Sequence, residues 1–498
     1  MIVGIDFGLV DVEDCNINKA DFMNAGNTPL AWAARSGHEE VVKMLLGRDN
    51  TNPDKPNNIG RTPLCYAAWN GHGRVVKMLL GRDDVNPDKP DIDGQTPLLY
   101  AALNGHEGVV KALLEQGEVN PNKIGGCGLA PLWCAAQNGH ERVVGMLLGR
   151  SDVNPNIQDD RGLTPLCCAA RGGHEGIAKM LLGRGDISPD KARDDGRTPL
   201  WYAAHGGHEG VVKILFGRSD VDPNKPGWRG RAPLLCAARS GHGGAVKMLL
   251  GRGDVNPNQP DDDGLTPLCC AAGNGHEGVV KILLGRDDVD PGRPDNKGRT
   301  PLRSAAWNGH RGAAELLLRR EDVDPGKPDN DGLTALWCAA RNGHEGVVKL
   351  LLRRDDVTPD KPVKRGRTPL WCAAWNGHEG VVRILLGRDD VNPNQPDDDG
   401  RTPLWAAAWN GDEGVVKMLL GRGDVNPDEP DNRGRTPLRC AIWNGHKGVV
   451  EALLGRGDVN PNKPDNDGRT PLWCATHRGH ADVIALLQPL ESATPSTT

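Results

Sequence analysis

The stretch that decides the fold is Asp-Asn-Arg-Gly-Arg-Thr-Pro-Leu, residues 431–438, which returns with small changes along almost the whole chain. Its Thr-Pro-Leu core, or a close variant, starts again every 34 residues. The first position of the triplet is occupied by Thr28, Thr62, Thr96, Ala130, Thr164, Thr198, Ala232, Thr266, Thr300, Thr334, Thr368, Thr402, Thr436 and Thr470. A fixed period of this length indicates small units stacked in an array, so we predict fourteen repeats of 34 residues.

Each repeat carries the signals of two short helices. In repeat two, the Thr62 hydroxyl can cap a helix, and Pro63 suits the first helical position because no hydrogen bond is lost there. Gly71 follows the Ala-Ala pair and can take the left-handed conformation that ends a helix. Apolar residues at helical spacing predict a second helix, as in residues 415–420, with Arg422 placed near its C-terminal dipole. The Asp-Val-Asn-Pro and Asp-x-x-Gly segments that follow predict tight turns.

Taken together, these motifs resemble the ankyrin repeat. In chain order they read Gly-x-Thr-Pro-Leu, Ala-Ala-x-x-Gly-His, Val-Val-x-x-Leu-Leu and Asp-Val-Asn. The resemblance implies an all-α solenoid of helix-turn-helix units with β-hairpin fingers, curved so that a concave face is available to bind a partner protein. The 34-residue form, with Asn-Gly-His-Glu-Gly-Val-Val-Lys, also resembles the C-terminal sensor arrays of fungal NOD-like (STAND-type) receptors.

We predict three regions along the chain. Residues 1–22 are an N-terminal cap or a remnant of another fold, residues 23–490 hold the fourteen repeats, and residues 491–498 form a disordered tail. The last helix begins at Ala481, and we expect Pro489 to stop it because proline lacks the backbone donor that a helix needs.

The composition argues against several classes of protein. Lys and Arg number 60 against 66 Asp and Glu, which gives a net charge of −6 and no sign of the basic face of a nucleic-acid-binding protein. Apolar runs are far shorter than the roughly 20 residues of a membrane span. We find no secretory signal at the N-terminus. The sequence therefore predicts a cytoplasmic protein that binds neither nucleic acid nor membrane.

Histidine and cysteine recur with the repeat and not in clusters. Thirteen of the 15 His follow Gly in the Gly-His step, with Asp412 in that place in repeat twelve. Most of the 13 Cys stand just before the Ala-Ala pair, where we expect reduced packing residues without disulfides or bound zinc. No phosphate-binding loop or catalytic set is present in the sequence. We expect no cofactor, no metal and no enzymatic activity.

Positions that differ between repeats indicate where a partner would bind. The position after Ala-Ala varies most, and the candidate partner-binding residues there are Trp69, Trp307, Arg341, Trp375, Trp409 and Trp443. Each of these Trp repeats also has Arg before the capping Thr. The predicted pairs are Arg61 with Trp69, Arg299 with Trp307, Arg367 with Trp375, Arg401 with Trp409 and Arg435 with Trp443. Of these arginines, we also predict Arg299, Arg367, Arg401 and Arg435 to bind the partner. Guanidinium stacking on indole explains this pairing, and recent duplication explains it equally well.

We expect the candidate Trp side chains to be substantially exposed on the concave face, because Trp and Arg often dominate binding energy. The alternative is that they merely cover the helix stack. A second set of indoles is expected to pack inside the array: Trp133, Trp201, Trp337, Trp371, Trp405 and Trp473.

The sequence thus predicts a monomeric protein-binding scaffold that recognises a partner protein through its concave face. The alternative is a ligand-sensing array of a fungal innate-immunity or self-recognition receptor without its nucleotide-binding domain. Nucleic-acid binding by the Arg and Trp residues is opposed by the acidic balance and would show as a steep salt dependence.

Overall fold

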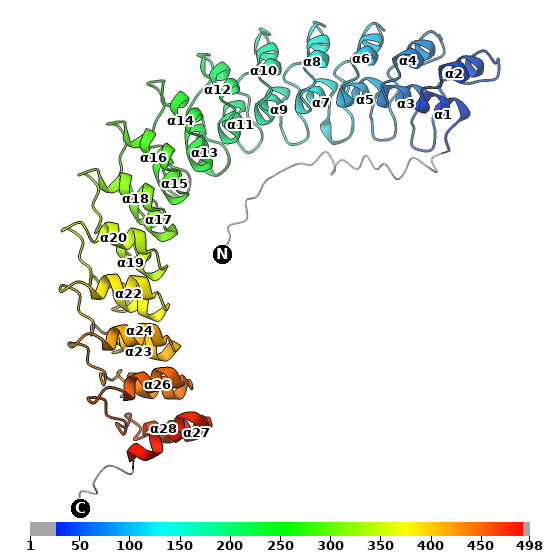
Figure 1. Ribbon diagram of the computed structural model, residues 1–498. Coiled ribbons are helices and arrows are strands. Elements are labelled where there is room, and N and C mark those ends of the chain that lie inside the picture. Colours follow the sequence, from blue (N-terminus) through cyan, green and yellow to red (C-terminus); the bar gives the residue numbers. More distant parts are fainter. Residues whose placement is uncertain (1–25, 492–498) are drawn as a thin grey trace, which may run out of the picture. The chain divides into compact units, whose positions relative to one another are not determined.

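A computed structural model describes residues 26–491, and its regular secondary structure is helical, with turns between the helices. Twenty-eight α-helices lie in this range, two to each predicted repeat (Figure 1). The chain divides into two compact parts between Val255 and Asn256, and each part is described by itself. Residues 1–22 and the tail after Glu491, predicted as a cap or remnant and as disordered, lie outside the described residues.

The helices up to Val255 alternate between a first and a second helix of each repeat. The first helices are α1 (Pro29–Ser36), α3 (Pro63–Trp69), α5 (Pro97–Asn104), α7 (Pro131–Gln137), α9 (Pro165–Gly172), α11 (Pro199–Gly206) and α13 (Pro233–Ser240). The second helices are α2 (Glu39–Leu46), α4 (Gly73–Leu80), α6 (Glu107–Leu114), α8 (Glu141–Leu148), α10 (Glu175–Leu182), α12 (Glu209–Phe216) and α14 (Gly243–Leu249). Two short 3-10 helices, η2 (Gly126–Gly128) and η3 (Trp228–Gly230), lie in connections.

The part from Asn256 onward repeats this order. Its first helices are α15 (Pro267–Gly273), α17 (Pro301–Asn308), α19 (Ala335–Arg341), α21 (Pro369–Trp375), α23 (Pro403–Asn410), α25 (Pro437–Trp443) and α27 (Pro471–Arg478). Its second helices are α16 (Glu277–Leu284), α18 (Arg311–Leu318), α20 (Glu345–Leu351), α22 (Glu379–Leu386), α24 (Glu413–Leu420), α26 (Lys447–Leu454) and α28 (Ala481–Glu491).

The first helices begin and end as their sequence predicts. The Thr368 hydroxyl accepts a hydrogen bond from the Trp371 amide at 3.1 Å, and Pro369 follows at the first helical position. Gly309 ends α17 with a φ of 77°, in the left-handed region that glycine adopts without strain. Ala130 and Ala232 cannot supply the hydroxyl, and α7 and α13 have no side-chain cap.

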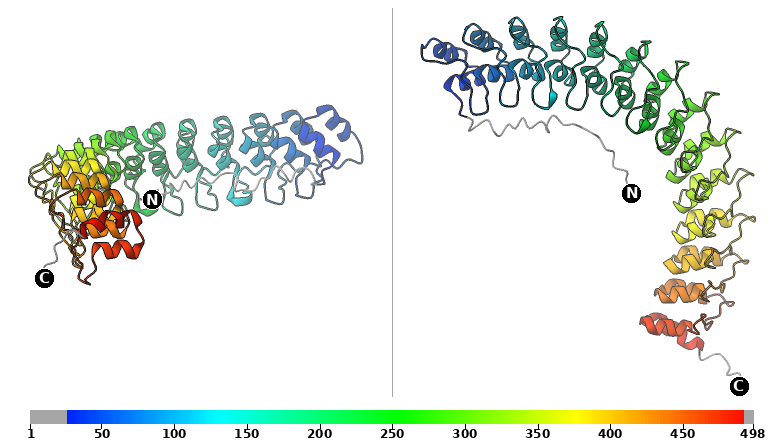
Figure 2. Two further views of the ribbon diagram at one scale, coloured as in Figure 1. Left: turned by 60° about the horizontal axis from the view of Figure 1, so that its bottom comes forward. Right: turned by 180° about the vertical axis from the view of Figure 1, so that it is seen from behind.

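Within each part the first helices stack on one another in one row and the second helices in a second row (Figures 1 and 2). The Ala-Ala pair is at the centre of this packing, as at Ala373 and Ala374, which are fully buried. Small side chains there let neighbouring helices approach closely. Val381, Val382 and Leu385 of α22 are also fully buried and cover the other side of the same core.

The predicted β-hairpin fingers are present as tight turns, and within residues 26–491 no β-strand is formed. In repeat nine the Asp295 amide donates to the Arg299 carbonyl at 3.0 Å. The Asp295 carboxylate accepts from the amides of Lys297 and Arg299 at 2.9 and 2.8 Å. A buried aspartate therefore closes this turn with its own side chain, in the manner of an Asx-turn, and Asp261, Asp397 and Asp431 do the same in their repeats. One isolated bridge joins Gly227 and Arg231.

Polar side chains join successive repeats at regular places. The His446 Nε2 donates to the Trp409 carbonyl, 37 residues earlier, at 3.1 Å. The Arg422 guanidinium donates to the Leu386 carbonyl at 3.0 Å and also binds Asp424. Arg422 was expected to interact with the end of its own helix, whereas it caps the second helix of the preceding repeat, because stacking brings that helix end within its reach.

Two further observations concern helix length. The last helix, α28, continues through Pro489 to Glu491, so the expected stop at Pro489 is wrong. Proline has a φ compatible with a helix and here removes only one bond near the end. None of the helices in residues 26–491 is long and apolar enough to cross a lipid bilayer.

Candidate functional site

The candidate residues lie on the side of each part that is built by the first helices and the turns before them. We call this side the finger face; it corresponds to the predicted concave face. Trp69 lies in the part before Val255. The other four Trp lie in the part after it, on α17, α21, α23 and α25. These four, Trp307, Trp375, Trp409 and Trp443, are called the indole row below.

Exposure differs along the indole row. Trp307 is 37% exposed, whereas Trp375, Trp409 and Trp443 are half-buried, as is Trp69. The expectation of substantial exposure therefore fits Trp307 alone. The reason is the residue one helical turn earlier. Trp375 stacks on Trp371 with ring centroids 5.3 Å apart and planes 7° apart, because residues at i and i+4 lie on one helix face.

The same arrangement recurs in the next repeat. Trp409 stacks on Trp405 with centroids 5.1 Å apart. In repeat thirteen the neighbour is not an indole, and Trp443 is covered from the following repeat by His477 and Arg478, whose guanidinium lies 4.7 Å from the ring centroid.

The predicted pairing of Arg and Trp within a repeat holds only for Arg61, which lies 5.9 Å from the Trp69 ring centroid. Arg367 lies over Trp371 at 4.4 Å and Arg401 over Trp405 at 5.0 Å. Both therefore reach the buried indole one helical turn earlier, called the inner indole, and not the outer indole, Trp375 or Trp409. The inner indole is only four residues away along the chain, and the outer one is eight. The outer ring is thus held by the inner indole.

The two remaining pairs are also corrected. Arg435 lies over the rings of the preceding repeat, 5.6 Å from Trp405 and 5.9 Å from Trp409. The Arg299 guanidinium is drawn to Asp295 at 2.5 Å, and Arg303 takes its place over Trp307 at 5.2 Å. Arg341 is exposed on α19 and lies over the ring of Trp337 at 5.3 Å.

The indoles that were expected to pack inside the array do so, with one exception. Trp133, Trp201, Trp337, Trp371 and Trp405 are between 2% and 7% exposed. Trp371 donates its indole N–H to the Arg401 carbonyl of the next turn at 2.9 Å. Trp473 is 42% exposed, because no described repeat follows to cover it.

Sequence reasoning missed a pocket of about 320 Å³ on the finger face of repeat nine. At the position where the next three repeats have a buried Trp, this repeat has Arg303, and Ser304 follows it. The signal was a charged residue in a position that holds Trp, Cys, Leu or Ala in every repeat except the ninth and the thirteenth. The pocket is lined by Lys297, Arg299, Arg303, Ser304, Trp307, Asn308, Asp329 and Asp331.

Comparison with known protein families agrees with this architecture. The family model described as ankyrin repeats (3 copies) matches residues 8–91, 83–159, 132–227, 185–261, 234–329, 312–397, 382–465 and 425–496. The chain belongs to the ankyrin-repeat family. No curated protein matches it. Ankyrin repeats are generally protein-binding scaffolds and typically not catalytic.

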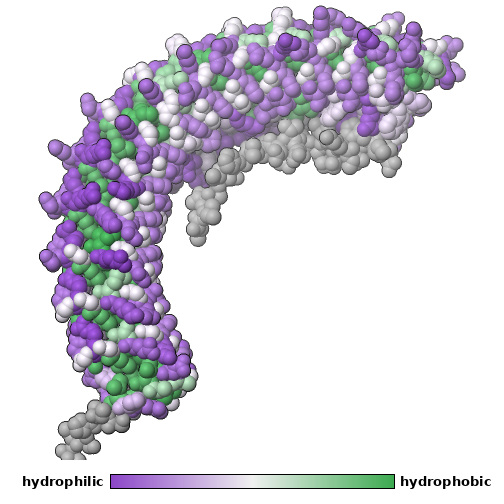
Figure 3. Space-filling model, in the orientation of Figure 1, coloured by the Kyte–Doolittle hydropathy of each residue, from purple (hydrophilic) through white to green (hydrophobic). Residues whose placement is uncertain are grey.

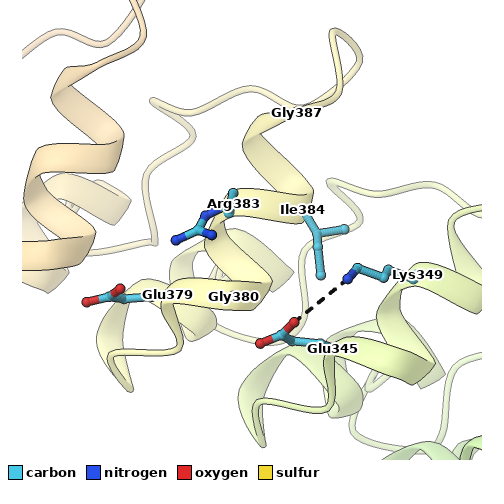
Figure 4. Close-up of a pocket in the computed structure, with 7 residues that line it drawn as sticks. All are labelled: Glu345, Lys349, Glu379, Gly380, Arg383, Ile384 and Gly387. Atoms are coloured by element: carbon cyan, nitrogen blue, oxygen red, sulfur yellow. Dashed lines mark ion pairs between the residues drawn. The ribbon is translucent and has the colours of Figure 1, made fainter.

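The ankyrin array has a larger groove on its opposite side. It measures about 650 Å³ and lies between α20 and α22, where Glu345, Lys349, Glu379 and Arg383 surround Ile384 (Figure 4). Lys349 pairs with Glu345 at 3.8 Å, and all four charged side chains are exposed. Two positive and two negative charges balance here, and water solvates them. Size alone therefore does not make this groove a binding site.

The thiols of the ankyrin core are packing groups. Eleven cysteines of the described chain are buried and carry no disulfide. Burial raises the pKa of Cys65 to about 11 and that of Cys372 to about 12, so both remain protonated near neutral pH. Within residues 26–491 no group of three or more His, Cys, Asp and Glu is arranged to hold a metal ion.

Proposed function

We propose that this ankyrin array is a scaffold that recognises a partner protein through its finger face, with the indole row as the main contact. The observation that carries the proposal is the indole row itself. Four indoles follow one another on first helices of the part after Asn256, and Arg341, Arg367, Arg401 and Arg435 lie among them. Trp and Arg are the residue types most enriched at binding hot spots.

Stacking favours this role over that of a simple cover. An outer indole held parallel to an inner one, as Trp375 is on Trp371, is fixed in position before a partner arrives. A side chain that is already ordered loses little conformational entropy on binding. On the visible surface, hydrophobic residues are bordered by hydrophilic ones (Figure 3).

The test uses a double variant, Trp307→Ala with Trp375→Ala. We expect the affinity for the partner to fall by at least about 2 kcal/mol, since hot-spot residues contribute at that level. The partner is first captured from an extract of the source organism with the wild-type array, then identified, purified and titrated against both proteins.

The matched control is Glu379→Ala with Arg383→Ala, on the opposite side, which should leave the affinity unchanged. Both variants should unfold within a few degrees of the wild type. Equal affinity of wild type and double Trp variant would contradict the proposal. Unfolding of the array by the Trp changes would show that these indoles serve the core.

A narrower form of the proposal is the ligand-sensing array of a fungal immune or self-recognition receptor. The 34-residue period with its recurring Asn-Gly-His-Glu-Gly-Val-Val-Lys favours it. Long-read sequencing of the transcripts that contain this reading frame would test it, because such a receptor needs a nucleotide-binding domain in the same message. We further propose a cytoplasmic monomer, whose mass by light scattering would be near 53.4 kDa.

A further inference from the structure

We propose that the pocket of repeat nine receives one acidic side chain, Glu or Asp, of the partner protein. The carboxylate would be bound by Arg303 and Lys297, and the aliphatic stem would lie on Trp307. This inference rests on the proposed function, and it adds the chemistry that one position of the partner must have.

The space in this pocket is a consequence of the sequence. In repeat eleven the corresponding room is filled by Trp371, which is 2% exposed and bonded to a carbonyl of the next turn. In repeat nine the side chain is that of Arg303, whose guanidinium instead pairs with Asp329 at 2.9 Å. Ser304, the next residue, is small and does not fill the remaining space. The outer Trp307 therefore has no indole beneath it, which explains why it is the most exposed of the row.

One donor in the pocket is left without an acceptor. Arg303 is only 8% exposed, and its Nε has no hydrogen-bond partner in the described structure. A buried donor without a partner destabilises the fold, because the hydrogen bonds that it lost to water are not replaced. An acceptor supplied by a partner protein would remove this cost. The Nε atoms of Arg367, Arg401 and Arg439 also have no hydrogen-bond partner among the described residues, so repeat nine is distinguished by the open space beside Arg303 together with this donor.

The charges of the pocket fit one negative group. Each carboxylate already has a cation: Asp295 binds Arg299, Asp329 binds Arg303, and Asp331 binds Lys364 at 2.9 Å. Lys297 is exposed at the rim and forms no direct ion pair among the described residues, although the charges of Lys364, Arg303 and Lys297 together lower the pKa of Asp331. Four cations against three carboxylates leave a charge of +1, whereas the whole chain carries −6. A monoanion balances this excess.

A carboxylate suits the pocket better than an amide of the same shape. Its oxygens accept hydrogen bonds only, and both Arg303 and Lys297 only donate. A glutamine would turn its NH2 group toward one of these cations. Hydrogen bonds between charged partners are roughly twice as strong as neutral ones, so the pocket should discriminate Glu from Gln.

The experiment measures binding of a short probe to the full chain. The probe is the blocked tripeptide acetyl-Gly-Glu-Gly-amide, with acetyl-Gly-Gln-Gly-amide as the comparison. The protein is labelled with 5-fluorotryptophan, and the Trp307 resonance is assigned with the variant Trp307→Phe. We expect the Trp307 signal to shift and to saturate as the Glu probe is added. Half-saturation should need a concentration of the Gln probe about fivefold or more above that of the Glu probe. Added salt should weaken the Glu probe.

Variants separate the pocket from the fold. Arg303→Trp gives repeat nine the residue of the next three repeats, and it should abolish the shift by filling the space. This variant removes the cation that pairs with Asp329. Arg299 can replace it, because at the corresponding positions two repeats later Arg367 lies 3.6 Å from Asp397. The matched control is Arg439→Trp, the same change at the other Arg repeat, which should leave the Trp307 shift intact. If Arg303→Trp fails to fold, Arg303→Met removes the charge and keeps the stem.

Equal binding of the two probes, or binding that survives in Arg303→Trp or Arg303→Met, would overturn the inference. So would the absence of any shift with the Glu probe at low salt. The probe experiment uses no partner protein. A negative result with the probe therefore does not contradict the proposal that the indole row binds a partner protein. Conversely, if the double variant Trp307→Ala with Trp375→Ala still bound the partner, the preference of the pocket for Glu would stand.

Discussion

At the scale of single residues, Asp412 shows what the histidine of the Gly-His step does, because it replaces that histidine in repeat twelve. In the flanking repeats a histidine Nε2 bonds a carbonyl of the preceding repeat, as His446 does with Trp409. Asp412 is acceptor-only when ionised and cannot do this. The Trp375 carbonyl is instead bonded by the Asn410 amide at 2.5 Å. Burial raises the pKa of the Asp412 carboxyl, so the fold disfavours its charge.

Asp412→His should therefore stabilise the array by about 0.5–1.5 kcal/mol, because the imidazole adds a hydrogen bond between repeats. Denaturant unfolding followed by circular dichroism measures the change. The reverse change, His446→Asp, should destabilise by a similar amount. No gain from Asp412→His would show that Asn410 alone satisfies this carbonyl.

The variant Asp412→Asn isolates the effect of charge. Since the pKa of Asp412 is raised in the fold, the wild type loses stability as pH rises through that pKa. The advantage of Asn over Asp should accordingly be larger at pH 7 than at pH 4.

At the scale of helices, adjacent residues determine where each helix begins and ends, whereas contacts between long side chains determine how the surface is arranged. Caps, glycine stops and turns follow from a few adjacent residues, and these were correctly predicted, as at Thr368 and Gly309. The partner of Arg367 could not be predicted in the same way. Its flexible side chain reaches either of two indoles, and the choice depends on how Trp371 and Trp375 stack.

The pocket of repeat nine was missed for a related reason. The positions that vary on the surface do not include residue 303, because the pocket arises from a substitution at a core position. In the sequence, Arg303 stands out because most other repeats have Trp, Cys, Leu or Ala at the equivalent position. Its consequence, an empty space beside Trp307, needed the packing of two neighbouring repeats.

Helix caps provide a prediction at this scale. Ala232→Thr should restore the missing hydroxyl acceptor at the start of α13 and stabilise the array by about 1 kcal/mol. The control is Thr266→Ala, which removes the bond that the Cys269 amide donates to the Thr266 hydroxyl at 3.1 Å, and it should destabilise by as much. Thermal unfolding of both variants against the wild type gives the comparison. An unchanged Ala232→Thr variant would mean that capping is not limiting here.

At the scale of the whole molecule, stability is the sum of terms from single repeats and from neighbouring pairs. Local defects should then remain local. Repeats four and seven lack the capping hydroxyl, and repeat four has the Gly126–Gly128 turn. In repeat nine Ala313 and Ala314 are fully buried where most other repeats bury larger Val residues.

Amide exchange followed by mass spectrometry should be fastest in repeats four, seven and nine among repeats two to thirteen. Repeat eleven, with its cap and its Val381-Val382 pair, is the internal reference. Uniform protection across these repeats would contradict a stability that is built from nearest neighbours.

The bonds between repeats have a consequence for how such a chain can change over generations. His72 reaches the Arg35 carbonyl and His446 the Trp409 carbonyl through the same atoms and over the same 37 positions. Wherever His stands at this position, a gene that loses or duplicates one complete repeat by misaligned recombination therefore encodes a junction whose inter-repeat hydrogen bond is already in place. The array can lengthen or shorten without passing through an unfolded ancestor. An event between repeats nine and thirteen would also change the number of repeats between Trp307 and Trp443, and so the spacing of the indoles that a partner must match.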